Sequence, residues 1–76
     1  MGYHFSDIVK AHSASALKTV RNGITTYFLK LDGADKFVRV SRDNYDYAKS
    51  LMKRWDSLLT EIDRNNTIRH YTSLRR

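Results

Sequence analysis

The stretch ALKTVRNGITTYFLKLDGADKFVRVS, from Ala16 to Ser41, carries the clearest strand and turn pattern of the chain. Two turn signals, Asn22-Gly23 and Asp32-Gly33, flank an alternating run that extends from Ile24 to Leu31. Asn-Gly favours a two-residue type I′ turn, because both central positions of that turn need a positive φ. The pattern therefore predicts a three-stranded antiparallel meander, with strands at about 16–21, 24–31 and 36–41.

The turn lengths determine which residues stand opposite one another. A two-residue first turn places Leu17 opposite Phe28, and a four-residue second turn places Leu29 opposite Val38. Because side chains alternate between the faces of a strand, one face of the sheet is largely apolar and is expected to face the core. That face carries Ala16, Lys18, Val20, Thr25, Tyr27, Leu29, Leu31, Val38 and Val40. The second face mixes apolar, aromatic and basic groups: Leu17, Thr19, Arg21, Ile24, Thr26, Phe28, Lys30, Phe37, Arg39 and Ser41.

Two helices are expected beside this sheet. Residues 1–15 predict a short helix capped by Ser6, followed by a loop. A long helix is expected over 43–64, with Asp43 in its cap, because apolar residues recur at spacings of three and four. Trp55 lies in the middle of this stripe and is the expected core anchor. The stripe consists of Ala48, Leu51, Met52, Trp55, Leu58, Leu59 and Ile62.

The remaining residues, 65–76, predict a basic tail that packs partly or frays, because Asn65-Asn66 is a credible helix end. The expected fold is thus α+β, a single small domain of order α-β-β-β-α over residues 1–76. Its three-stranded antiparallel meander packs on the long C-terminal helix, since two amphipathic elements bury their apolar faces against each other.

Composition narrows the class of protein. The chain has 76 residues, and 41% of them are hydrophobic, which favours one folded domain over disorder. It has no leader and no apolar stretch of membrane-spanning length, so we expect a complete soluble protein of the cytoplasm. It has no cysteine, so we expect no disulfide and no thiolate metal site. The net charge of +6 favours polyanionic partners.

No residue pattern predicts catalysis. His4, His12 and His70 are scattered and form no pair with metal-ligand spacing. The chain has neither a Gly-x-Ser-x-Gly elbow nor a glycine-rich phosphate loop. We therefore expect a protein that is not an enzyme and that has no metal site and no cofactor.

The second sheet face is the candidate binding surface. Phe28 is expected beside Arg39, and Lys30 beside Phe37, as cation–π pairs. Aromatic and basic groups on a sheet suit base stacking and phosphate contacts. The candidate nucleic-acid-binding residues are Arg21, Phe28, Lys30, Phe37, Arg39 and Arg42, and Lys49, Lys53 and Arg54 are candidate secondary contacts. Two alternatives remain: the N-terminal helix or the tail covers this face, or the face binds a protein.

The segment from Lys36 to Trp55 resembles a stretch of small phage and mobile-element proteins that include AP2-like DNA-binding modules and the leading part of some HNH endonucleases. The matching features are Val38-x-Val40, then an acidic residue and Tyr45, then Trp55. The resemblance implies a three-stranded sheet with one helix that binds DNA, or an accessory protein that disables a host protein. No HNH metal-binding motif follows, so the resemblance does not imply nuclease activity.

The expected element order is also similar to that of a double-stranded-RNA-binding domain. The basic signature Lys-Lys-x-Ala-Lys of that family is missing, because Arg42-Asp-Asn-Tyr-Asp46 stands at the expected start of the second helix. DNA is therefore the more strongly expected nucleic acid. The expected function is that of a non-enzymatic, nucleic-acid-binding accessory protein of phage or mobile-element type, monomeric or homodimeric, working in the cytoplasm, of the host if viral. The alternative is a phage-type protein that inhibits or modulates a host protein through the same surface.

Overall fold

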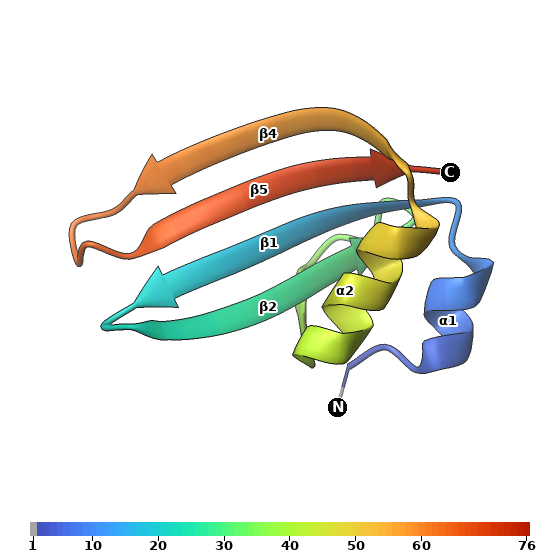
Figure 1. Ribbon diagram of the computed structural model, residues 1–76, viewed down its shortest axis with the longest axis horizontal. Coiled ribbons are helices and arrows are strands. Elements are labelled where there is room, and N and C mark those ends of the chain that lie inside the picture. The colour runs from blue at the N-terminus through green and yellow to red at the C-terminus, as the bar shows by residue number, and fades with distance from the viewer. Residues whose placement is uncertain (1) are drawn as a thin grey trace.

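The computed structural model describes residues 2–76, apart from the side chains of residues 55–57. Five antiparallel strands form one sheet in the order β3-β2-β1-β5-β4, and two helices pack beside it (Figure 1). In chain order the elements are α1 (Phe5–Lys10), β1 (Ser13–Arg21), β2 (Ile24–Leu31), β3 (Val38–Val40), α2 (Arg42–Leu51), β4 (Arg54–Ile62) and β5 (Ile68–Arg75).

The first hairpin confirms the predicted turn and register. Asn22 and Gly23 have φ values of 51° and 77°, as a type I′ turn requires. Leu17 stands opposite Phe28 across β1 and β2. The predicted pairing of Leu29 with Val38 across β2 and β3 is confirmed as well. Strand β3 is shorter than the expected 36–41, and β1 begins at Ser13 where a loop was expected.

Gly23→Val should destabilise the protein by more than about 1 kcal/mol, because valine is strained at a positive φ. A Cβ at position 23 would meet no atom within 4 Å, so the backbone conformation alone causes the loss. Thermal unfolding measures it. Gly23→Asn is the control and should lose less, since asparagine tolerates this conformation. Equal melting temperatures for the valine variant and the wild type would contradict the turn assignment.

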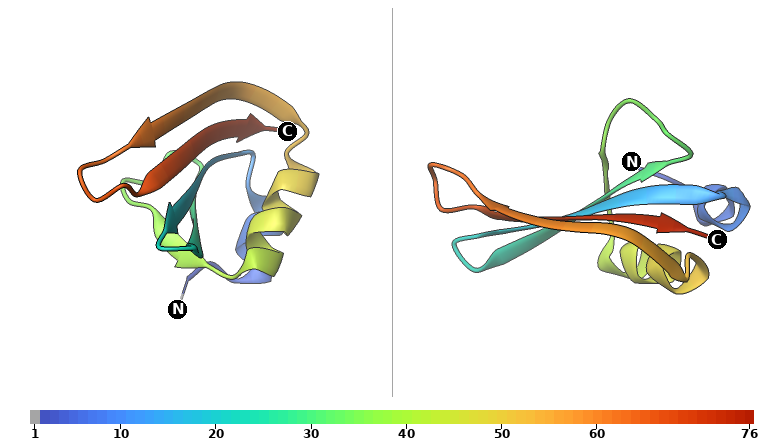
Figure 2. Two further views of the ribbon diagram at one scale, coloured as in Figure 1. Left: turned by 60° about the vertical axis from the view of Figure 1, so that its left-hand side comes forward. Right: turned by 90° about the horizontal axis from the view of Figure 1, so that it is seen from above.

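Helix α2 packs on one face of the sheet, and α1 lies at the end of β1 and packs on α2 (Figure 2). Ala16 of β1 and Ala48 of α2 are fully buried. The rings of Phe5 and Tyr47 stack with centroids 4.2 Å apart and join α1 to α2. The buried core consists of Ile8, Ala11, Ala14, Ala16, Leu29, Leu31, Tyr45, Ala48, Met52 and Leu74. The predicted apolar face of β2 therefore lies in the core.

The helix starts differ from the predictions. Helix α2 begins at Arg42, and Ser41 caps it by accepting a hydrogen bond from the backbone N–H of Asn44 at 3.1 Å, in place of the expected Asp43. Helix α1 begins at Phe5, with His4 at the N-cap, two residues before the start that a cap at Ser6 would give. There the Asp7 carboxylate accepts a hydrogen bond from the His4 N–H at 2.9 Å.

The prediction of one long helix over 43–64 was wrong. Helix α2 ends at Leu51, Met52 leaves the helical conformation with φ −100° and ψ 87°, and the chain then enters strand β4. Apolar spacings of three and four fit a helix, but Leu58, Leu59 and Ile62 are all exposed on β4. The expected role of Trp55 as anchor on a helix therefore fails, because residue 55 belongs to a strand; its side chain lies outside the described residues.

The predicted basic tail over 65–76 was also wrong. Strand β5 lies between β1 and β4 and pairs with both. Asn65 and Asn66 belong to the turn of a hairpin, in which Asn66 has a φ of 58°. The fold is thus α+β with a five-stranded sheet, and the three-stranded meander on a long helix is ruled out. The physical reason is that β5 satisfies the backbone groups of β1, which would otherwise form a long open edge.

Asp32 links the end of β2 to the start of β1. Its carboxylate oxygen Oδ1 accepts hydrogen bonds from the backbone N–H groups of His12 at 2.8 Å and Ser13 at 3.2 Å. These bonds, led by that from His12, hold the pKa of Asp32 below its ordinary value.

In the described residues, no helix is long and apolar enough to cross a membrane.

Candidate functional site

The face of the sheet opposite the helices is open over much of its area, and we call it the open sheet face. The right-hand view of Figure 2 shows α2 on one side of the sheet and the β2–β3 loop on the other. Strand register places side chains from β1, β2, β3 and β5 on this face together. They are Ser15, Leu17, Thr19, Arg21, Ile24, Thr26, Phe28, Lys30, Arg39, Arg69, Tyr71 and Ser73.

An aromatic cluster occupies the middle of the open sheet face. The β2–β3 loop brings the Phe37 ring to within 6.3 Å of the Tyr71 ring on β5, measured between centroids. Lys30 Nζ lies 4.6 Å from the centroid of Phe37, so this predicted cation–π pair is confirmed. Leu17, between Phe28 and Tyr71 in the register, is only 8% exposed.

The two segments that could have covered the open sheet face, the N-terminal helix and residues 65–76, both lie elsewhere. The N-terminal helix α1 packs on α2, and the expected tail is itself a strand of the sheet. Neither of them covers the open sheet face. The loop before β3 covers its middle, and the groups toward the Asn22-Gly23 turn stay accessible.

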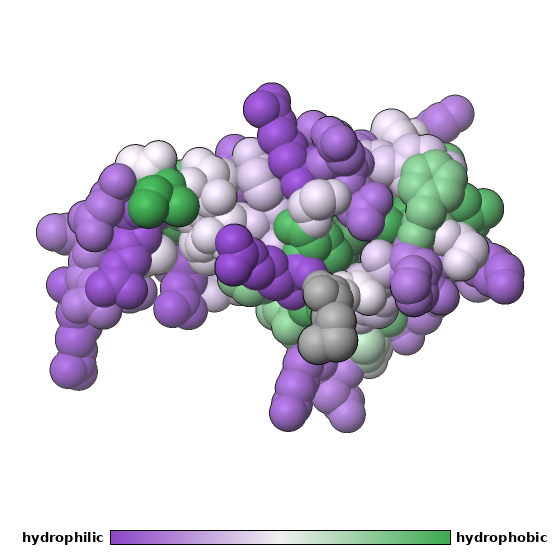
Figure 3. All heavy atoms as spheres, turned by 90° about the horizontal axis from the view of Figure 1, so that it is seen from below, coloured by the Kyte–Doolittle hydropathy of each residue, from purple (hydrophilic) through white to green (hydrophobic). Residues whose placement is uncertain are grey.

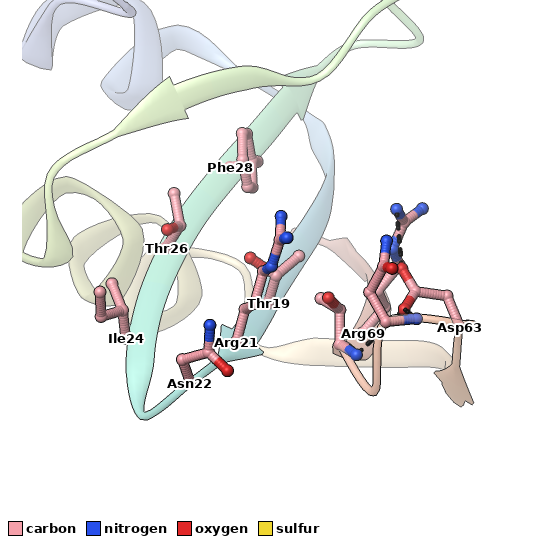
Figure 4. A pocket seen from close by; sticks show the side chains of 10 residues that line it. Thr19, Arg21, Asn22, Ile24, Thr26, Phe28, Asp63 and Arg69 are labelled. Atoms are coloured by element: carbon pink, nitrogen blue, oxygen red, sulfur yellow. Dashed lines mark hydrogen bonds and ion pairs between the residues drawn. The ribbon is translucent and has the colours of Figure 1, made fainter.

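A hollow of about 520 Å³ lies at that end of the face (Figure 4). Phe28, Thr26 and Ile24 come from β2, while Thr19 and Arg21 come from β1. The turn between β4 and β5 closes the other side. The lining residues that it contributes, or that lie beside it, are Asp63, Asn65, Thr67 and Arg69. The hollow thus has an aromatic group at one end, threonine hydroxyls within it and arginines at its rim.

Hydrogen bonds hold the turn side of the hollow in place. Asp63 Oδ1 accepts from the backbone N–H of Asn65 at 2.9 Å and of Thr67 at 3.0 Å. Asp63 Oδ2 lies 3.5 Å from Nη2 of Arg69. The backbone bond from Thr67, then that from Asn65 and the charge of Arg69, lower the pKa of Asp63.

The two arginines of the hollow differ in their surroundings. The Tyr71 side chain, followed by the charges of Asp63 and Glu61, raises the pKa of Arg69. The Tyr71 hydroxyl itself donates to Glu61 Oε1 at 3.1 Å. Among the described residues, none forms an ion pair with Arg21, which is exposed. Arg21 therefore contributes an uncompensated positive charge, whereas part of the charge of Arg69 is offset.

The structure brings most of the predicted primary site residues together. Arg21, Phe28, Lys30 and Phe37 lie on the open sheet face, and Arg39 stands opposite Phe28 in the register. Arg42 does not join them. It begins α2, on the helix side of the sheet, and Nε of its guanidinium lies 3.6 Å from Asp46 Oδ2.

The predicted secondary contacts form no common surface with those residues. Lys49 is on α2, where its Nζ lies 5.4 Å from the centroid of the Tyr45 ring. Lys53 is exposed in the link between α2 and β4. Arg54 starts β4, at the far edge of the sheet.

Sequence reasoning missed Arg69, Tyr71 and Ser73, because residues 65–76 were interpreted as a tail. The signal was present: from Ile68 to Leu74 the chain is rich in β-branched and aromatic residues and follows an Asn-Asn turn.

In the described residues, no three His, Cys, Asp or Glu side chains gather as a metal site would need. Viewed from the β2 side, hydrophilic groups dominate the surface and hydrophobic ones form separate spots (Figure 3).

No protein-family model, no curated protein and no solved structure matches this chain. Its function is therefore inferred from the chemistry of the open sheet face alone.

Proposed function

We propose that this protein binds nucleic acid, DNA in preference to RNA, through the open sheet face, and that it does so without catalysis. The observation that carries the proposal is the gathering of Arg21, Lys30, Arg39 and Arg69, from four strands, on the face that the helices leave open. Such a set of cations attracts a polyanion, and the net charge of +6 acts in the same direction.

The hollow supplies a place for a base. Phe28 at its end offers a ring for stacking, and stacking of a base on an aromatic side chain is worth about 1–3 kcal/mol. The hydroxyls of Thr19 and Thr26 are hydrogen-bonding groups beside it. Arg21, at the rim, is placed to contact the adjoining phosphate.

DNA is preferred over RNA on the basis of α2. The α-β-β-β-α order that resembled double-stranded-RNA-binding domains is not the order of this chain, and the basic signature of those domains at the helix start is missing as well. The first turn of α2 instead holds Asp43, and Asp46 offsets the charge of Arg42. A strongly basic helix start that would follow RNA phosphates is therefore lacking among the described residues.

Fluorescence anisotropy with labelled single-stranded DNA, duplex DNA and single-stranded RNA, at several salt concentrations, tests the proposal. Binding should weaken with salt, by a log–log slope of about −0.9 per phosphate contact on duplex DNA and about −0.7 on single strands. Arg21→Gln and Arg39→Gln should each weaken binding and make the slope shallower by about one contact. Arg42→Gln is the matched control: it removes the same charge from the helix side and should change affinity much less.

Equal losses for Arg42→Gln and Arg21→Gln would mean that net charge alone drives binding, and would contradict the site. Affinity no better than that of an unrelated protein of equal charge would overturn the proposal. The alternative, an inhibitor or modulator of a host protein, would then take its place. It has less support, because Leu17, Phe28 and Phe37 are buried or half-buried and only Ile24 of that apolar set is exposed.

A further inference from the structure

The two edges of the sheet are unequally protected. Strand β3 is only Val38–Val40, and the N-terminal segment lies against it, since a Cβ on Gly2 would stand 2.6 Å from the carbonyl oxygen of Arg39. Strand β4 is long, Arg54–Ile62, and forms the upper edge of the sheet in Figure 1. No other described strand pairs with its outer side. A long open edge with unpaired backbone groups is a template for another strand.

The side chains of β4 add to this effect. Leu58 is 68% exposed, Ile62 is 67% exposed and Leu59 is 57% exposed. Leu58 and Ile62 point to the helix side of the sheet, whereas Leu59 points to the open sheet face. An edge strand is usually blunted by charges or proline; β4 carries charges toward its ends, at Arg54 and Glu61, but it presents apolar groups on both of its faces.

Charge complementarity identifies the partner as a second copy of the chain. β4 begins with a basic residue, Arg54, and has an acidic residue, Glu61, near its end. The strand register places both side chains on the open sheet face. Antiparallel pairing of two identical strands sets the start of each against the end of the other. It therefore brings opposite charges together twice.

The bulge in β4 places these charges in register. Arg54 pairs with Arg75 and Ser57 pairs with Ser73. Three residue positions along β4 thus match two along β5, because the bulge adds one residue to β4. We place Leu58 on the two-fold axis, so that it stands opposite Leu58 of the second copy. If the bulge shortens β4 by one position against the second copy, as it does against β5, Arg54 stands opposite Glu61 of the second copy.

We infer that two copies of this chain pair antiparallel through β4 and form one continuous ten-stranded sheet. A two-fold axis perpendicular to the sheet keeps the two open sheet faces on the same side. The dimer thus presents a doubled basic surface. The inference concerns a different surface from the proposed nucleic-acid site and does not depend on it.

Disulfide trapping tests the pairing, because the chain has no cysteine of its own. Residues opposite each other in an antiparallel pair are about 4.5–5.5 Å apart between Cα atoms, within disulfide range. Leu58→Cys should therefore give a covalent dimer under mild oxidation. Ile24→Cys is the matched control, since Ile24 is 69% exposed but lies on β2, and it should stay monomeric. Equal dimer fractions for the two variants would overturn the inference.

Sedimentation equilibrium of the untagged protein tests the association without a covalent bond. Leu58→Lys should raise the dimer dissociation constant by about tenfold or more, while Ile24→Lys leaves it unchanged. Arg54→Glu and Glu61→Arg should each weaken self-association, and an equal mixture of the two should regain it, because both cross-contacts then join opposite charges. A wild-type protein that stays monomeric at every concentration, or a mixture that regains nothing, would overturn the inference.

Discussion

Removing residues 67–76 should leave the chain unfolded. Those residues include all of β5, which pairs with β1 on one side and with β4 on the other. Their loss would strip the hydrogen-bond partners from both strands and take away Leu74, a core residue that is 1% exposed. Far-UV circular dichroism and the dispersion of amide signals in an NMR spectrum measure the outcome.

The control is removal of Arg76 alone. That residue ends the chain beyond β5, and its backbone N–H donates to the carbonyl of His12 at 3.1 Å. We expect the fold to survive its loss. A folded, strongly helical protein ending at residue 66 would contradict the five-stranded sheet and restore the long helix.

Leu29→Ala should cost about 2–5 kcal/mol, as large-to-small changes in a core do. Leu29 is fully buried, lies on the helix side of β2 and stands opposite Ala16, whose methyl group is too small to fill the gap. A domain of this length is stable by about 4–11 kcal/mol, so the variant should lose much of its stability. Urea unfolding followed by tryptophan fluorescence gives the free energy.

Ile24→Ala is the control for this change, because Ile24 is on the same strand but exposed. Its cost should stay within about 0.5 kcal/mol, as for surface substitutions. Similar losses for the two variants would show that Leu29 is not a core residue, and the packing of the helices on the face of β2 would then be wrong.

The first hairpin could be predicted because its signals are local. Asn22-Gly23 supplies the two positive φ values, and a two-residue turn leaves one register for β1 and β2. The assignment of Phe28 and Arg21 to the same face followed from that register. The pairing of Lys30 with Phe37 followed as well, although Phe37 reaches the open sheet face from a loop rather than from β3.

Residues 54–62 could not be assigned in the same way. Their apolar residues recur at spacings that fit a helix, and the stretch has no proline or glycine to stop one. The choice of strand depends on a partner distant in sequence, because β4 gains its backbone hydrogen bonds only when β5 returns beside it. The Asp63 carboxylate fixes that return by accepting two backbone hydrogen bonds in the turn.

By itself, then, the sequence determined the β1–β2 hairpin, the apolar side of β2, and the basic and aromatic character of its other side. Each of these depends on residues a few positions apart. The folded chain alone shows that Tyr71 and Arg69 join Phe28 and Arg21 on one face, and that Leu58 and Ile62 stand at an open edge. Those positions result from strand pairing between distant segments, in which β5 completes both β1 and β4. The local pattern from Ile68 to Leu74 indicates a strand but does not specify its partners.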